Sequence, residues 1–261
     1  MPAPHGKCRI CGRLGKLSYE HVPPRAAYNN KPILLATFED IQKVEHASLD
    51  LDSVRGKISQ RGMGAHTLCG QCNSDTGAWY GNSYVSWAQQ GMELAQYAAK
   101  APSLVYTFRI HPLQVLKQIV CIFMSTNGAE FAEKHPDLVK FVLDKHARFI
   151  NPTTRIYTYY SLSPRVRQTG VTAAGSFDGA GFRIMSEFAF VPFGYLMSFD
   201  STPPDDRLCE ITGFNRFSYD DWHEINLRLP VLPIYTYFPG DYRDKATVMR
   251  QVEMSRAKGE R

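Results

Sequence analysis

The sequence predicts an α+β protein with a small N-terminal module followed by a larger mixed domain. Three observations carry this prediction. Two Cys-x-x-Cys pairs flank a strand pattern near the N-terminus, an apolar helix pattern follows the second pair, and strand patterns dominate after residue 155. Ala101 and Pro102 end the helix pattern. We therefore divide the chain into domains at residues 1–100 and 101–261.

The composition narrows the class of protein. Of the 261 residues, 44% are hydrophobic and 21% are charged, which is typical of a globular chain. The net charge of +5 permits a nucleic-acid partner without indicating one. Neither an apolar run of membrane-spanning length nor a secretion signal is visible. We expect a cytoplasmic protein with reduced cysteines and no membrane partner.

The N-terminal module is predicted from its strand and helix patterns. The segment "LGKLSYEHVPP" predicts a strand that ends near His21, because Pro23 and Pro24 interrupt regular structure. The 44 residues between His21 and His66 are too many for a plain loop, so they are expected to carry structure of their own. A helix is predicted after Cys72. Its apolar face has members three and four residues apart: Tyr80, Tyr84, Trp87, Gly91, Leu94 and Ala98.

The second domain begins with helices and ends with strands. We expect a strand at "LVYTFRI", a helix over about 112–125, and a helical region broken near Pro136. Further strands are predicted at "RIYTYYSLS", "FRIMSEFAF", "YLMSF" and "VLPIYTYF". In "FRIMSEFAF" the aromatic residues fall on one face and Arg183 and Glu187 on the other. The polar tail from Arg243 is expected to be a solvated helix or a frayed end.

Four of the six cysteines form a predicted metal site. A two-residue spacer lets both sulfurs of a pair face one ion, and four thiolates complete a tetrahedral zinc shell. Because no open position remains for water, such a zinc ion would be structural. The alternative is a redox pair. The four ligands are Cys8, Cys11, Cys69 and Cys72.

A second candidate site lies beside the cysteines. Glu20 and His21 fall between the two pairs, and Asn73 directly follows the last cysteine. A carboxylate and an amide oxygen suit a hard divalent cation, Mg²⁺ or Mn²⁺. A neutral histidine could take a proton from an attacking water. This chemistry would serve phosphodiester cleavage, whereas Asn73 as a helix N-cap is the structural alternative.

The motifs "CRIC", "EHVPP" and "LCGQCN", in this order, resemble HNH endonucleases of the ββα-metal type, in the zinc-knuckled arrangement of endonuclease VII. The resemblance covers about residues 8–95. It implies a ββα-metal module clamped by a structural zinc, with Glu20 and Asn73 as ligands of the catalytic cation and His21 as general base. The implied function is metal-dependent cleavage of DNA, with RNA left open as a substrate.

The sequence departs from the family pattern at three points. Glu20 stands where the family usually has aspartate, and the insertion between the strands is long. The segment "GMGAHTLC" lacks the asparagine that usually precedes the second cysteine pair, so His66 is the nearest polar candidate to orient the site.

Basic residues surround the first cysteine pair and could hold backbone phosphates, although such a run is often only a solvated face. Residues 101–261 are assigned substrate selection, sensing or dimerisation, with a homodimer as the candidate assembly. Two alternatives to an enzyme remain: a non-catalytic zinc-finger module that binds nucleic acid or protein, and a structural zinc protein with His21 packed inside. The candidate phosphate-binding residues are Lys7, Arg9, Arg13, Lys16 and Arg25.

Overall fold

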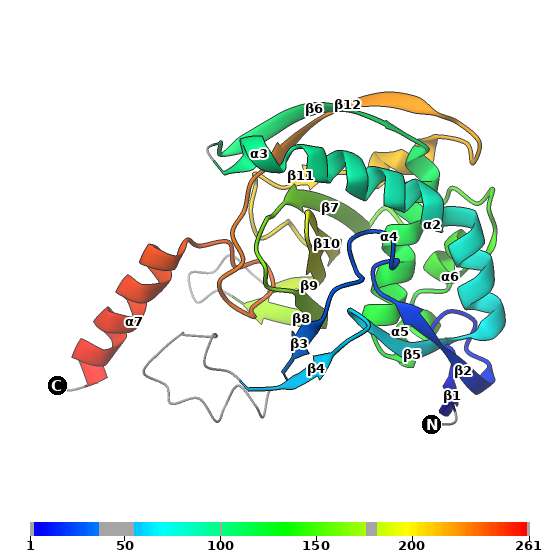
Figure 1. The fold of residues 1–261 in the computed structure, drawn as a ribbon, viewed down its shortest axis with the longest axis horizontal. Coiled ribbons are helices and arrows are strands. Elements are labelled where there is room, and N and C mark those ends of the chain that lie inside the picture. The colour runs from blue at the N-terminus through cyan, green and yellow to red at the C-terminus, as the bar shows by residue number, and fades with distance from the viewer. Residues whose placement is uncertain (1–2, 37–54, 100, 176–181, 260–261) are drawn as a thin grey trace.

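The computed structural model describes residues 3–36, 55–99, 101–175 and 182–259 (Figure 1). Helices and antiparallel sheets occur together, which confirms the α+β class. The N-terminal elements are β1 (His5–Lys7), β2 (Leu14–His21), β3 (Ile33–Leu35), β4 (Lys57–Ser59), β5 (Gly64–Cys69), α2 (Gly70–Glu93) and α3 (Ala95–Ala98).

The remaining elements begin with a strand and three helices: β6 (Ser103–Ile110), α4 (Pro112–Thr126), α5 (Ala129–Lys134) and α6 (Pro136–Leu143). Strands then dominate: β7 (Thr154–Tyr160), β8 (Arg167–Gly175), β9 (Phe182–Phe190), β10 (Phe193–Phe199), β11 (Cys209–Glu210) and β12 (His223–Pro230). A 3₁₀ helix over Thr212–Arg216 precedes β12, and α7 (Lys245–Gly259) follows it. Among the described residues, no helix is both long and apolar enough to cross a membrane.

The N-terminal sheet has the order β1-β2-β5, with both pairs antiparallel. As predicted, β2 ends at His21. Helix α2 begins at Gly70, within the second cysteine pair and earlier than the predicted start after Cys72. A bulge between Ser18 and Tyr19 shifts the register of β2 against β5. In the long insertion β3 pairs with β4, which confirms local structure there. Residues 37–54 of the insertion lie outside the described part of the chain.

Helix α2 joins the N-terminal sheet to the rest of the protein. The residues of the predicted apolar face are all buried, but the predicted single helix is interrupted at Leu94, and Ala98 lies on the short α3. The ring of Trp87 lies 4.3 Å from that of Phe108 and 4.5 Å from that of Phe193, centroid to centroid. The Nε1 of Trp87 also donates a hydrogen bond of 2.9 Å to the Tyr195 hydroxyl. At Gly91 a Cβ would lie 2.3 Å from the Phe193 ring, so only glycine permits this close approach.

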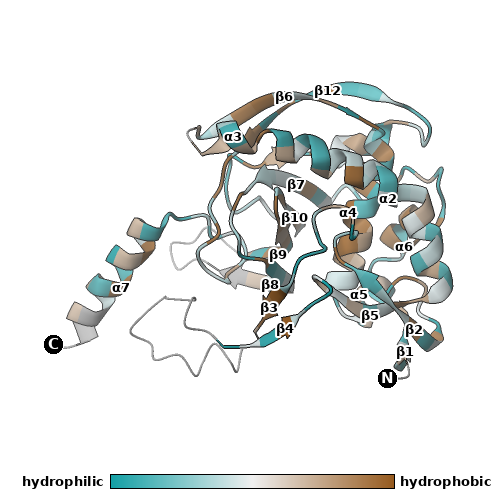
Figure 2. Cartoon of the chain, in the orientation of Figure 1, coloured by the Kyte–Doolittle hydropathy of each residue, from teal (hydrophilic) through white to brown (hydrophobic). Residues whose placement is uncertain are grey.

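The central sheet is antiparallel, in the order β11-β7-β10-β9-β8. Helix α4, buried along almost its whole length and strongly apolar in Figure 2, packs against α2 and this sheet. The β6–β12 ribbon crosses over α2 (Figure 1). One cluster of buried apolar residues contains side chains from both sides of residue 100. The division of the chain at residue 100 stays a prediction.

Several sequence predictions need correction. "VLPIYTYF" was expected to be a strand, but only Val231 forms an isolated bridge, with Tyr160. Pro233 lacks a donor for a strand ladder, which accounts for the error. The strand lies just before it, as β12, and was missed together with β8. In β9 the alternation is present, but both faces are buried from Met185 onward, and Glu187 is 0% exposed.

Candidate active site and metal centre

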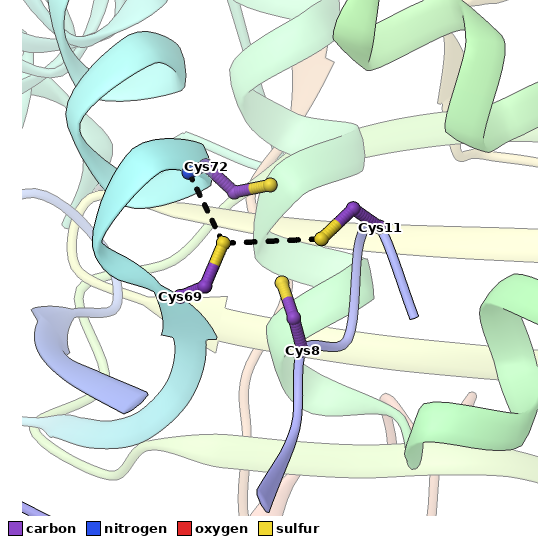
Figure 3. A group of neighbouring side chains, drawn as sticks. All are labelled: Cys8, Cys11, Cys69 and Cys72. Carbon is purple, nitrogen blue, oxygen red and sulfur yellow. Dashed lines mark hydrogen bonds between the residues drawn. The ribbon is translucent and has the colours of Figure 1, made fainter. Parts of the chain in front are cut away.

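The four predicted zinc ligands form one cluster (Figure 3). Their sulfur atoms all lie within 4.8 Å of one another, and the sulfurs of Cys11 and Cys69 are 3.8 Å apart. In a tetrahedral site with zinc–sulfur bonds of about 2.3 Å, neighbouring sulfurs are separated by about 3.8 Å. The cluster can therefore hold a metal ion, and its geometry is compatible with structural zinc.

Local backbone geometry brings the first pair together. The turn after β1 places the N–H of Gly12 at 2.9 Å from the carbonyl of Cys8, and Gly12 has a φ of +71°, which favours glycine. Arg13 donates through Nε to the sulfur of Cys11 at 3.3 Å. A hydrogen bond with Cys72, the largest contribution, lowers the pKa of the Cys8 thiol to about 4. The thiolate is the form that binds a metal.

His21 lies at the end of β2 with one ring nitrogen already engaged. Its Nε2 is 3.1 Å from the carbonyl oxygen of Arg61. A carbonyl can only accept, so Nε2 carries the proton in this contact and Nδ1 keeps the lone pair of the neutral ring. Burial, helped by the charges of Arg25 and Arg61, lowers the pKa of His21. This shift favours the neutral ring, which is the form that can accept a proton.

Asn29 holds the segment that orients His21, and no motif in the sequence marks it. Its side chain is 0% exposed, and its Nδ2 donates to the carbonyls of Pro23 and Met63, each at 2.7 Å. Its Oδ1 accepts from the N–H of Met63 at 2.6 Å. Gly62 fits only because it has no Cβ, which would lie 2.4 Å from the backbone oxygen of Asn29. These contacts fix the position of the Arg61 carbonyl.

Glu20 is buried on the opposite side of β2, because successive residues of a strand point to opposite faces. Its Oε1 accepts hydrogen bonds from the hydroxyls of Thr67 and, at 2.6 Å, Ser125. No described residue donates to Oε2. Burial raises the pKa of Glu20 to about 8, opposed by the hydrogen bond from Ser125 and the charge of Arg9.

Asn73 lies in the first turn of α2. Its Nδ2 donates to the Ser18 hydroxyl and to the carbonyl of Tyr19, both at 3.2 Å. This orientation leaves Oδ1 without a donor among the described residues. The N-cap of α2 is Cys69, whose sulfur accepts from the N–H of Cys72. The N-cap alternative for Asn73 is therefore wrong.

The three predicted catalytic residues line the same cavity. This cavity has a volume of about 330 Å³ and lies between the end of β2, α2 and α4. Glu20, His21 and Asn73 all contribute to its wall. Its wall thus includes a carboxylate and an amide, whose oxygens are the donor types that a hard divalent cation prefers, and binding of Mg²⁺ or Mn²⁺ stays a prediction.

The predicted phosphate-binding residues have different surroundings. Lys7 forms an ion pair with Glu133, and Arg9 donates to the carbonyl of Ser125 at 2.6 Å. Arg13 is engaged with Cys11, as described above. Lys16 is exposed, whereas Arg25 is exposed and also lines the cavity. Phosphate binding stays a prediction for all five, with Arg25 the best placed.

His66 is exposed on β5 and contacts the ring of Tyr19 edge-on, with centroids 5.3 Å apart. Tyr19 makes a similar contact with His21 at 5.2 Å. An orienting role for His66 would thus pass through Tyr19 and stays a prediction. The direct orienting contact to His21 comes from the Arg61 carbonyl.

A larger cavity of about 630 Å³ lies elsewhere, beside Tyr242 and the start of α7. Its arginines and aspartates largely pair with one another: Arg207 with Asp205, and Arg243 with Asp241, each at 2.6 Å. Its lining contains neither histidine nor cysteine. The smaller cavity is the one lined by Glu20, His21 and Asn73.

Comparison of the chain with protein-family models, with curated proteins and with solved structures found no match.

Proposed function

We propose that this protein is a metal-dependent endonuclease that hydrolyses phosphodiester bonds in DNA. The observation that carries the proposal is the shared cavity of Glu20, His21 and Asn73 next to a four-cysteine cluster. The order of these motifs along the chain is that of the HNH family, whose zinc-knuckled members the sequence resembles. In this proposal the cysteines hold a structural zinc and the module is of the ββα-metal type.

Each residue of the site has a role that follows from its contacts. Glu20 and Asn73 would hold Mg²⁺ or Mn²⁺, which would supply charge stabilisation for the phosphate and the leaving oxygen. His21 accepts the proton of the attacking water at Nδ1, because Nε2 is engaged with Arg61. The same carbonyl then stabilises the imidazolium by accepting from it. Arg25, exposed at the cavity, is placed to contact a backbone phosphate.

The remaining assignments follow the same proposal. Free cysteines in a zinc cluster suit a reducing compartment such as the cytoplasm. Residues 101–261 would select the substrate, sense a signal or mediate a homodimer. The hydrogen bond from the Ser125 hydroxyl to Glu20 connects this part of the chain to the site.

One observation favours the alternative of a non-catalytic zinc module that binds nucleic acid or protein. Glu20 is only 9% exposed and accepts two hydroxyl hydrogen bonds, as a buried structural acid does. In that case no second metal would bind, and His21 could be replaced without loss of DNA binding.

The decisive experiment is plasmid nicking in Mg²⁺ or Mn²⁺ by wild type and by His21→Ala. Removing a general base is expected to lower the rate by about 10²- to 10⁴-fold. His5→Ala, an exposed histidine in the same module, is the matched control and should nick like wild type. Zinc content must be equal in all three proteins.

Two other results would change the assignment. Equal nicking by wild type and His21→Ala would remove His21 from the mechanism. Zinc-loaded, folded wild type that binds DNA without nicking it in either cation would favour the binding module.

A further inference from the structure

The cavity at the candidate site continues as a groove along α2. Asn73, Gly77, Gly81 and Val85 recur at four-residue spacing, so they form one stripe of the helix, and all four line the cavity. Gln118 on α4 lines it from the opposite side. The groove therefore leads away from the residues that the proposed function assigns to catalysis.

The two glycines of this stripe have no packing reason within the described chain. A Cβ added at Gly77 or at Gly81 would meet no atom within 4 Å. Gly91 of the same helix is different, because the ring of Phe193 occupies the place of its Cβ. Alanine is a much better helix former than glycine, so glycine in a helix interior needs another explanation. Space kept free for a ligand that approaches the helix backbone is such an explanation.

Gln118 supplies a second, independent observation. Its side chain is only 9% exposed, and its Oε1 is fully enclosed without a hydrogen-bond partner in the described structure. By contrast Gln114, one turn earlier, uses its amide fully: it donates to the carbonyl of Tyr219 at 2.8 Å and accepts from Ser83 at 2.6 Å. The Nε2 of the same amide also has no partner among the described residues and is not enclosed, so it is the atom at which a ligand acceptor is expected.

We propose that the groove binds one unpaired nucleotide of a DNA strand, next to the phosphate that is cleaved. This inference rests on the proposed nuclease function and specifies its substrate. The phosphate lies at the end marked by Asn73 and Arg25, the base lies flat over Gly77 and Gly81, and the amide of Gln118 contacts the base edge.

The chemistry of the groove matches a nucleotide. A volume of about 330 Å³ falls in the range of sites for small ligands. A carboxamide offers one acceptor and two donors, which is the complement that base edges require. A base inside a duplex is stacked and paired, so it enters an enclosed site only when unpaired. Gln118 is therefore a specificity-determining residue.

The test measures DNA binding in the His21→Ala background with Mg²⁺, so that the strand is not cut. Fluorescence anisotropy compares a labelled 12-nucleotide single strand with the blunt duplex of the same sequence. Gly81→Leu fills the groove. Gly70→Leu is the control, because Gly70 is on the same helix, a Cβ added there also meets no atom within 4 Å, and it does not line the cavity. Gly81→Ala adds only one methyl group and replaces Gly81→Leu if that variant does not fold. Tm and zinc content are checked for every variant.

We expect the single strand to bind more tightly than the duplex, and Gly81→Leu to weaken single-strand binding by at least about tenfold. Gly70→Leu should stay within about twofold. Gln118→Leu should keep its Tm but lose the preference among oligo-dA, oligo-dC and oligo-dT, since one good amide–base contact is worth about tenfold in discrimination.

Each of the other outcomes contradicts the groove proposal, the nuclease proposal or both. Plasmid nicking by the parent protein, with binding that does not respond to Gly81→Leu, overturns the groove and leaves the nuclease proposal standing. Binding that is sensitive to Gly81→Leu, with no nicking by the parent, supports the groove and overturns the nuclease. Absence of DNA binding overturns both. Displacement of the strand by deoxythymidine monophosphate at an equal concentration would overturn the assignment to a strand, because a free nucleotide would then suffice.

Discussion

Glu187 on β9 and Glu20 on β2 are both buried carboxylates, but they differ in what surrounds them. Glu187 is 0% exposed, and Nη1 of Arg167, which is itself only 1% exposed, donates to both of its carboxylate oxygens at 3.1 Å. The Tyr159 hydroxyl at 2.5 Å and the N–H of Gly240 at 2.7 Å complete its shell. The charge of Glu187 is therefore balanced by a buried arginine.

Among the described residues no cation forms an ion pair with Glu20, although the charge of Arg9 is near enough to oppose the rise of its pKa. Two neutral hydroxyls reach one of its oxygens, and burial raises its pKa to about 8. The contrast separates two uses of a buried acid. Glu187 fastens the central sheet to the segment that precedes α7, whereas Glu20 lies beside a cavity into which a cation can come from outside.

The largest effect is expected from Arg167→Met. Removing one member of a buried ion pair leaves the other charge uncompensated, which costs about 3–5 kcal/mol of unfolding free energy. Denaturant unfolding measures this loss. Arg155→Met is the matched control, because Arg155 pairs with Glu210 at an exposed site and should cost less than about 1 kcal/mol. Equal losses of unfolding free energy in the two variants would show that the buried ion pair of Glu187 contributes no more to stability than an exposed one.

The pH dependence of stability should come from Glu20. Its folded pKa of about 8 lies above its ordinary value of 4.5, so between these values the folded state keeps a proton that the unfolded state has lost. Stability is thus full below pH 4.5 and falls as pH rises through 8, by up to about 1.4 kcal/mol per pH unit.

Unfolding of wild type and Glu20→Gln from pH 5 to pH 8, without added divalent cation, measures this slope. Because Gln is uncharged at every pH, the variant should lack the decline. Parallel curves for the two proteins would mean that Glu20 is ionised in the folded state throughout.

Adding a divalent cation should remove part of this penalty. At pH 8, Mg²⁺ at ten times its dissociation constant stabilises the folded wild type by about 1.4 kcal/mol, because the ion binds only the folded form. Thermal unfolding with and without Mg²⁺ measures the gain. Glu20→Gln should gain much less, whereas Arg155→Met should gain as much as wild type. Equal stabilisation of all three would place the Mg²⁺ site away from Glu20.

The smallest effect is expected from Ser125→Ala. Loss of its hydrogen bond to Glu20 should cost about 1 kcal/mol and raise the pKa of Glu20 further, because this hydrogen bond lowers it. Denaturant unfolding gives the first quantity, and carbon NMR of the Glu20 carboxyl gives the second. Ser83→Ala removes a comparable hydrogen bond, to Gln114, and should leave the Glu20 titration unchanged. A shift of equal size in both variants would argue against the local contact.

Much of the fold could be predicted because its signals are local. The apolar stripe of α2 and the prolines after His21 mark where those elements lie and end. Strand β8 escaped prediction because "RQTGVTAAG" lacks large apolar residues and is held by pairing with β9. "VLPIYTYF" misled because its aromatic and β-branched residues pack without forming a ladder.

The candidate site was predictable only where residue type and spacing carry the chemistry. The cysteine cluster followed from two spacers of two residues. The partners of Glu20 did not, because Ser125 lies 105 residues away and only the packing of α4 brings it there. Asn29 was equally hidden, since "YNN" gives no sign that one of its asparagines is buried and the next is exposed.

Helix α2 begins among the cysteines and ends against the rings of Phe108 and Phe193, as one uninterrupted rod. A protein cut after residue 99 would keep every proposed catalytic side chain, on β2 and α2, but would leave Trp87 and Tyr84 facing water. The first hundred residues are therefore not expected to fold as an independent unit that could be fused to another protein. A fusion protein that carries these residues would need other side chains to replace the aromatic rings that the second half of the chain packs on α2.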